Sequence, residues 1–157
     1  MPNDSSMTVV IKKTGKDSTA KQRGLQWMWF GEIAESGLGS EDTKDDVHLK
    51  AKWKFARPIF LRDSELFGAV FAGFELMVKD YDFELKRACY KEFTQDYIKT
   101  EYMNKAQRAE FLTNLQDFWL RKGVNLSDPA RYGLDDNFNI RKKDKQNGVS
   151  KPSFAGR

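Results

Sequence analysis

Residues 104–129, NKAQRAEFLTNLQDFWLRKGVNLSDP, carry the signals of a complete helix followed by an extended exit segment. Asn104 and Gln107 have the spacing of a capping box, in which each side chain binds the backbone N–H of the other residue. Large apolar residues then recur at helical spacing: Phe111, Leu112, Leu115, Phe118 and Trp119. Gly123 can supply the left-handed conformation that ends a helix, and Asp128 precedes proline, which disfavours helical backbone. We therefore expect a helix between the two signals, and a scaffold element rather than an active site.

The remaining chain predicts further helices and one small β element. The expected elements are a strand at Met7–Lys12, a helix from Ser18 or Thr19 to Ser36 with two apolar faces, a lysine-rich helix from Asp45 to Pro58, a buried apolar helix from Asp63 to Met77, and a helix at Phe83–Thr100. The expected fold class is therefore α+β and predominantly α-helical, with the β element at the N-terminus followed by about five helices.

Length and composition predict one domain with terminal extensions. A chain of 157 residues is typical of a single domain. We expect residues 1–6 to be disordered, residues 7–134 to form the domain, and residues 135–157 to form a basic, disordered tail that is poor in packing residues. The one cysteine, Cys89, excludes an intramolecular disulfide, and no apolar run approaches the roughly 20 residues that span a bilayer. A soluble, cytoplasmic protein is expected.

The charge is distributed unevenly along the chain. The formal net charge is +4, but residues 141–157 hold six basic residues against one acid. The first 30 residues are also basic, with five lysine or arginine residues against two aspartates, so the middle of the chain is acidic. Two basic ends around an acidic body indicate contact with a polyanion through particular surfaces.

Catalytic motifs are weak. The single histidine, His48, lies at helical spacing from apolar residues and is expected to be packed, and zinc ligands are too few. A magnesium-dependent nuclease needs only two or three carboxylates, and two clusters supply them: Asp42, Asp45 and Asp46, and Asp135 and Asp136. The first cluster is better explained as a helix N-terminus and the second as a solvated loop. We therefore expect no catalytic residue, metal or cofactor, with the nuclease kept as the alternative.

Basic residues near aromatic ones favour nucleic-acid binding. The predicted contact residues are Lys12, Lys13, Lys16, Lys21, Gln22 and Arg23 near the start, Lys50, Trp53, Lys54 and Arg57 on one helix, and Arg141, Lys142, Lys143 and Lys145 in the tail. Ammonium and guanidinium groups bind phosphates, and an exposed ring can stack on an unpaired base. Because no ordered recognition helix is evident, single-stranded DNA without strong sequence preference is the favoured ligand.

Three segments, taken in order, resemble the NinB family of phage recombination proteins. The first is Ser18-Thr19-Ala20-Lys21-Gln22-Arg23 with Leu25, Trp27 and Trp29, the second is the helix Asp46–Phe55 with its Trp53, and the third runs from Thr100 through Glu110-Phe111 and Phe118-Trp119 to Gly123–Pro129. The resemblance covers most of Thr8–Leu134. Between Leu61 and Thr100 the chain differs, because long apolar helical segments stand where family members often have a β-hairpin.

This resemblance implies a recombination mediator. Such a protein is a homodimer in the cytoplasm of the infected host, binds single-stranded DNA, and works with a single-strand-binding protein and a recombinase or strand-annealing protein. By position, the resemblance implies that two sets of residues contact DNA: Lys21, Gln22 and Arg23, and Lys50, Trp53 and Lys54. Two other readings remain open: a nuclease that acts on recombination intermediates, and a protein-docking module that does not bind DNA.

Overall fold

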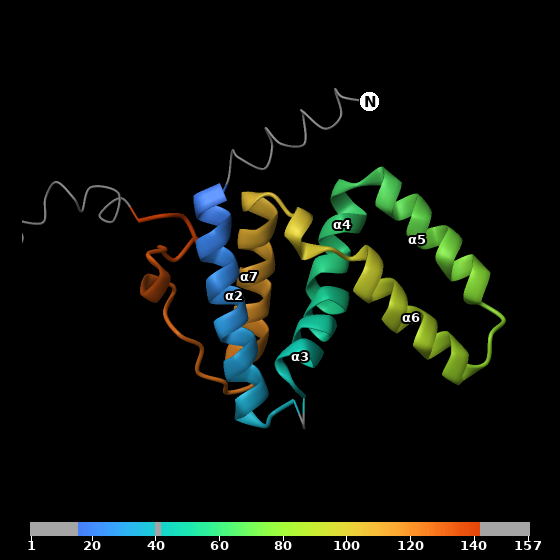
Figure 1. Cartoon of the computed structure of the whole chain (residues 1–157), viewed down its shortest axis with the longest axis horizontal. Coiled ribbons are helices and arrows are strands. Elements are labelled where there is room, and N and C mark those ends of the chain that lie inside the picture. Colours follow the sequence, from blue (N-terminus) through green and yellow to red (C-terminus); the bar gives the residue numbers. More distant parts are fainter. Residues whose placement is uncertain (1–15, 40–41, 142–157) are drawn as a thin grey trace, which may run out of the picture.

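The computed structural model describes residues 16–39 and 42–141, and this part of the chain is predominantly helical (Figure 1). Its elements are α2 (Lys16–Ser36), α3 (Lys44–Ala51), α4 (Arg57–Asp63), α5 (Glu65–Val78), α6 (Phe83–Tyr97) and α7 (Lys105–Arg121), with 3₁₀ turns at Thr100–Tyr102 and Pro129–Tyr132. The expected strand at Met7–Lys12 lies outside the described residues. Within them, β pairing is limited to one isolated bridge between Leu134 and Ile140.

Helix α7 begins and ends at the predicted signals. The Asn104 side chain accepts a hydrogen bond from the Gln107 N–H at 2.8 Å, and the Gln107 carboxamide accepts one from the Asn104 N–H at 3.0 Å. Gly123 follows the helix with a φ of 92°, and Asp128 is extended. These observations confirm the helix between the capping box and the glycine.

Helix α2 lies beside α7 and forms the centre of the core (Figure 1). Leu25, Trp29, Phe30 and Ile33 are fully buried, as the two predicted apolar faces require. The predicted start was wrong, because Ser18 and Thr19 lie inside the helix rather than capping it. Serine and threonine are only mildly unfavourable within helices, so helical backbone extends through them.

The segment after α7 is fixed against α2 by hydrogen bonds. The Trp29 indole Nε1 donates to the Ser127 carbonyl at 2.8 Å, and the Ser127 N–H donates to the Glu32 carboxylate at 2.8 Å. The Ser127 hydroxyl donates to the second oxygen of the same carboxylate. The exit segment is therefore part of the packed scaffold.

The packed chain continues beyond the predicted domain boundary at residue 134. Leu134 and Phe138 are buried, and the Gln22 side-chain amide donates to the Phe138 carbonyl at 2.8 Å. The expectation of disorder from residue 135 was therefore wrong for residues 135–141. Two apolar residues within a polar segment suffice here, because an aspartate-stabilised turn, in which Asp135 accepts from the N–H of Asn139, folds them onto α2. Residues 142–157 lie outside the described part.

Residues 44–63 form one continuous helical rod made of α3, a π-helical segment at Lys52–Ala56, and α4. The predicted end at Pro58 was wrong, because the rod continues to Asp63. In a regular α-helix a proline ring clashes with the carbonyl four residues earlier. The wider π turn relieves this, since the Arg57 N–H, immediately before the proline, donates to the Lys52 carbonyl five residues back.

Helices α5 and α6 form an antiparallel hairpin that extends away from α2 and α7 (Figure 1). Large rings fill the space between them. The ring centroids of Phe74 and Phe93 lie 4.4 Å apart, and those of Phe71 and Phe93 lie 5.5 Å apart. The prediction of a buried α5 was wrong for its outer side, where Leu66, Leu76 and Met77 are exposed. A Cβ built at Gly68 or Gly73 would meet no packed neighbour within 4 Å. An apolar sequence shows that a helix avoids water but not which partner covers it. Among the described helices, none combines the length and apolar character that crossing a bilayer requires.

The α7 cap gives a first testable prediction. Replacing Asn104 with alanine removes the side-chain acceptor for the Gln107 N–H, and we expect the free energy of unfolding to fall by about 1 kcal/mol. Urea unfolding followed by circular dichroism measures this change. Asn104→Asp, which keeps an acceptor, should unfold close to the wild-type midpoint, and equal losses in both variants would contradict a role of the cap.

Candidate nucleic-acid interface

The lysine-rich cluster predicted on the rod divides among three directions. Lys52 is buried, and its ammonium group donates to the Gln95 carbonyl at 3.3 Å. Burial lowers the pKa of Lys52, because a charged ammonium loses its hydration there. Trp53 packs toward α5 and α6, whereas Lys54 reaches the Phe118 ring of α7. The cluster is therefore not one cationic surface.

The first concavity, called here the α3–α7 groove, lies between the rod and the end of α7. Its volume is about 290 Å³, and it is lined by Leu38, Gly39, Asp42, Val47, Lys50, Ala51, Lys54, Phe55, Phe118, Trp119 and Lys122. The ammonium groups of Lys54 and Lys122 lie 4.5 and 5.1 Å from the centroid of the same Phe118 ring. Two cations from segments far apart in sequence thus meet at one aromatic ring.

The positive charge of the groove rests on two of its three lysines. Lys50 donates to the Asp42 carboxylate at 2.7 Å, so its charge is balanced by the one acid among the described residues of the lining. Lys54 and Lys122 remain as cations against the Phe118 ring, and the Trp119 ring lies edge-on to Phe118 at 5.1 Å. Ammonium groups can bind phosphate, and an aromatic ring beside them can stack on an unpaired base.

A second concavity lies on the opposite side of the rod and has similar chemistry. This Trp53 pocket has a volume of about 340 Å³ and is lined by Trp53, Phe83, Lys86, Arg87 and Tyr90. The Arg57 guanidinium lies 4.0 Å from the Trp53 ring, and its Nε donates to the Trp53 carbonyl at 3.0 Å. Trp53 is half-buried, and Tyr90 meets it edge-on at 5.3 Å. The pocket therefore presents rings with cations at the rim.

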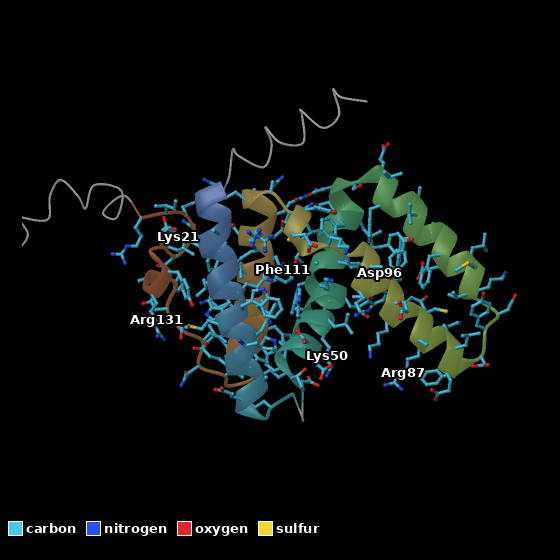
Figure 2. The ribbon with its side chains drawn as sticks, viewed as in Figure 1. Lys21, Lys50, Arg87, Asp96, Phe111 and Arg131 are labelled. Atoms are coloured by element: carbon cyan, nitrogen blue, oxygen red, sulfur yellow. The ribbon has the colours of Figure 1, made fainter. Side chains whose placement is uncertain are left out.

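The residues predicted on α2 lie away from these concavities. Figure 2 shows Lys21 near the upper end of α2 and Lys50 beside the lower part of the rod, so the two predicted cation sets do not form one surface. Lys21 and Arg23 are exposed, but Gln22 is fully buried and binds Phe138, which corrects its assignment as a DNA contact. The helical period explains this, because adjacent residues point about 100° apart.

The other predicted contacts are placed only in part. Lys16 lies in α2, and Arg141 is half-buried with its backbone N–H donating to the Gly133 carbonyl at 3.0 Å. The remaining predicted contacts fall outside the described residues: Lys12, Lys13, Lys142, Lys143 and Lys145.

Three of the five carboxylates proposed for a nuclease have structural partners: Asp42, Asp46 and Asp135. Asp46 accepts from the Thr43 N–H at 3.1 Å and so caps α3, and Asp42 pairs with Lys50. The capping hydrogen bonds hold the pKa of Asp46 below its usual range. Within residues 16–39 and 42–141, no three histidine, cysteine or acidic side chains gather as a metal site requires.

Several residues of the two concavities were missed from the sequence. Phe118 and Lys122 belong to the helix predicted as a scaffold element, and Lys86 and Arg87 were not among the predicted contacts. The basic residue beside Gly123 was a usable signal, since it places a cation where the chain turns. Which helix it faces depends on tertiary packing.

Comparison of the chain with protein-family models, curated proteins and solved structures finds no match.

Proposed function

We propose that this protein is an accessory protein of phage DNA recombination that binds single-stranded DNA without strong sequence preference. The observation that supports it most is the meeting of Lys54 and Lys122 over the Phe118 ring, in a groove that also holds Trp119. The resemblance of the sequence to the NinB family supports the same role.

In this proposal the groove holds the sugar-phosphate backbone and one or more unstacked bases. Lys54 and Lys122 neutralise phosphates and release condensed counterions, which supplies affinity for any sequence. Trp119 offers ring surface to a base, and each stacked base contributes about 1–3 kcal/mol. Bases in a duplex are already stacked and paired, so the groove favours single strands. The Trp53 pocket offers a second site of the same kind.

The wider role belongs to the same proposal. The protein acts as a homodimer in the cytoplasm of the infected host, together with a single-strand-binding protein and a recombinase or strand-annealing protein, and it uses no cofactor. These partners follow from the family resemblance. The groove supports only the contact with DNA.

A double charge reversal in the groove tests the proposal. Lys54→Glu combined with Lys122→Glu should weaken binding of a labelled single-stranded oligonucleotide at least about tenfold. The dependence of the logarithm of affinity on the logarithm of salt should become shallower by about one to one and a half, since two phosphate contacts are lost. Fluorescence anisotropy at two salt concentrations measures both quantities.

The matched control places the same charge change elsewhere. Lys91 and Lys105 are exposed on α6 and at the start of α7, and Lys91→Glu with Lys105→Glu also brings the formal net charge from +4 to zero. The control should bind nearly as tightly as the wild type. Equal weakening of both double variants would contradict the groove and leave only net charge as the cause.

Two assays on the wild-type protein distinguish the proposal from the nuclease and from the docking module. Shortening of single-stranded or branched DNA in the presence of Mg²⁺ would indicate the nuclease. A wild-type protein that binds no oligonucleotide at low salt would overturn the proposal in favour of the docking module.

A further inference from the structure

Helix α5 has an apolar face that the described chain leaves uncovered. Its outer residues Leu66, Leu76 and Met77 are 75%, 68% and 60% exposed, and Val70 is exposed between them. These positions share one side of the helix at about 100° per residue, together with Ala69 and Gly73. Phe71, on the other side, is buried against α6. Helix α5 is thus apolar on two sides, and Figure 1 shows no helix over its outer side.

Leaving this face in water is unfavourable. Burial of an exposed leucine side chain contributes about 1.5–3 kcal/mol, and contiguous exposed apolar patches on soluble proteins mark interaction sites. The sequence from Leu66 to Phe74 contains no charged residue that would keep another apolar surface away. An apolar partner is therefore favoured over a charged polymer.

The order of side chains along α5 makes the face complementary to itself. In an antiparallel pair of α5 helices, Leu66 of one copy lies opposite Met77 of the other when Val70 lies opposite Gly73. The bulky ends then meet each other, and the valine enters the space over Gly73, where a built Cβ would meet no packed neighbour within 4 Å. The same register brings Glu65 of one copy near Lys79 of the other, at both ends of the pair. A parallel pair would instead place like charges together.

We propose that the outer face of α5 is the interface with a second copy of this chain, in which the two α5 helices pair antiparallel about a two-fold axis. Such an isologous interface uses the same patch on both subunits, as the mirrored pattern requires. This interface gives the homodimer of the proposed function a surface and an orientation, and it does not depend on DNA binding.

Oligomeric state in solution tests the interface. Sedimentation equilibrium of the full chain at tens of micromolar should give about twice the monomer mass of 18.2 kDa. Leu76→Glu should raise the dimer dissociation constant at least about tenfold, because it buries a carboxylate in the interface. The helical circular dichroism at 222 nm should be retained, because Leu76 is exposed in the monomer. Leu120→Glu makes the same chemical change on the exposed side of α7 and should stay dimeric.

A charge exchange tests the orientation. Glu65→Lys and Lys79→Glu should each weaken the dimer severalfold, because each sets like charges opposite each other twice. The double variant should restore wild-type association, since the opposite charges then meet again.

A wild-type protein that is monomeric at several hundred micromolar, or a dimer indifferent to Leu76→Glu, would overturn the interface. Failure of the double variant to recover would overturn the antiparallel arrangement. DNA binding by a monomeric variant would leave the proposed DNA contact intact, so the interface and the DNA contact fail separately.

Discussion

Replacing Trp29 with alanine is expected to lower the free energy of unfolding by about 3–5 kcal/mol, the usual range for removing a large buried aromatic side chain. Trp29 is fully buried in α2 and meets Phe138 edge-on at 5.8 Å. Its indole also donates to the Ser127 carbonyl at 2.8 Å. The substitution thus opens a cavity and leaves a carbonyl of the exit segment without its donor. Since small domains are stable by only 5–15 kcal/mol, this is a large share of the total. Urea unfolding at pH 7.5 measures it.

Two further variants separate packing from hydrogen bonding. Trp29→Phe keeps a ring but removes the donor, so we expect an intermediate loss of about 1–3 kcal/mol. Tyr102→Ala removes a ring that is exposed, and it should change stability by less than about 0.5 kcal/mol. A Trp29→Ala protein as stable as Tyr102→Ala would show that the exit segment holds its place without α2.

Local signals predicted the scaffold well wherever the physics is local. The capping box of α7 and its terminal glycine depend on residues within one helical turn, and both were readable from the sequence. The two apolar faces of α2 were equally readable, because a helix covered on two sides must be apolar on two sides. These signals need no knowledge of the tertiary fold.

The predictions failed where a distant segment decides the outcome. The rod continues through Pro58 because a π turn at Lys52–Ala56 accommodates the proline ring. The sequence around this turn contains no signal that predicts it. Phe138 is buried against Trp29 of α2, and Gln22, more than a hundred residues earlier, binds its carbonyl. The outer face of α5 is exposed because the described chain folds no element over it. Hydrophobicity alone predicted its burial but could not name the partner.

The candidate site was predicted in part for the same reason. Lys54 was found from its place among lysines and a tryptophan, but Lys52 in the same run is buried. Lys122 completes the α3–α7 groove from another helix, so its role depends on how α7 packs against the rod. Residue type identified the chemistry, whereas the tertiary fold determined which residues share a surface.

His48 occupies an aromatic environment that makes its protonation unfavourable. Its ring stacks on Phe30 with centroids 5.0 Å apart and meets Trp27 edge-on at 4.8 Å, and its Nε2 lies 3.4 Å from the Thr100 hydroxyl. Burial is the main cause that lowers the pKa of His48 from 6.5 to about 4. Lys52 and Arg108 lower this pKa further, and Glu101 and Asp45 oppose them.

The shifted pKa predicts a loss of stability in mild acid. Between pH 6.5 and pH 4 the unfolded chain protonates His48 while the folded protein holds it neutral. The unfolded state then binds more protons, so the free energy of unfolding falls as the pH falls through this window. The contribution of His48 is complete above pH 6.5 and should decrease by roughly 2–3 kcal/mol between pH 7.5 and pH 4.5.

The comparison that isolates His48 uses a variant that cannot titrate. Carboxylates that pair or cap in the folded state, such as Asp46, also lose stability in acid, but their effect is common to the wild type and to His48→Gln. Urea unfolding of both proteins from pH 7.5 to pH 4.5 should therefore show that the wild type loses more stability than the variant as the pH falls. The glutamine costs some packing at pH 7.5, and this offset is constant across the series. Only the change of the stability difference with pH therefore reports the protonation of His48. Parallel curves would mean that water reaches the ring and that His48 titrates near its ordinary value in the folded protein.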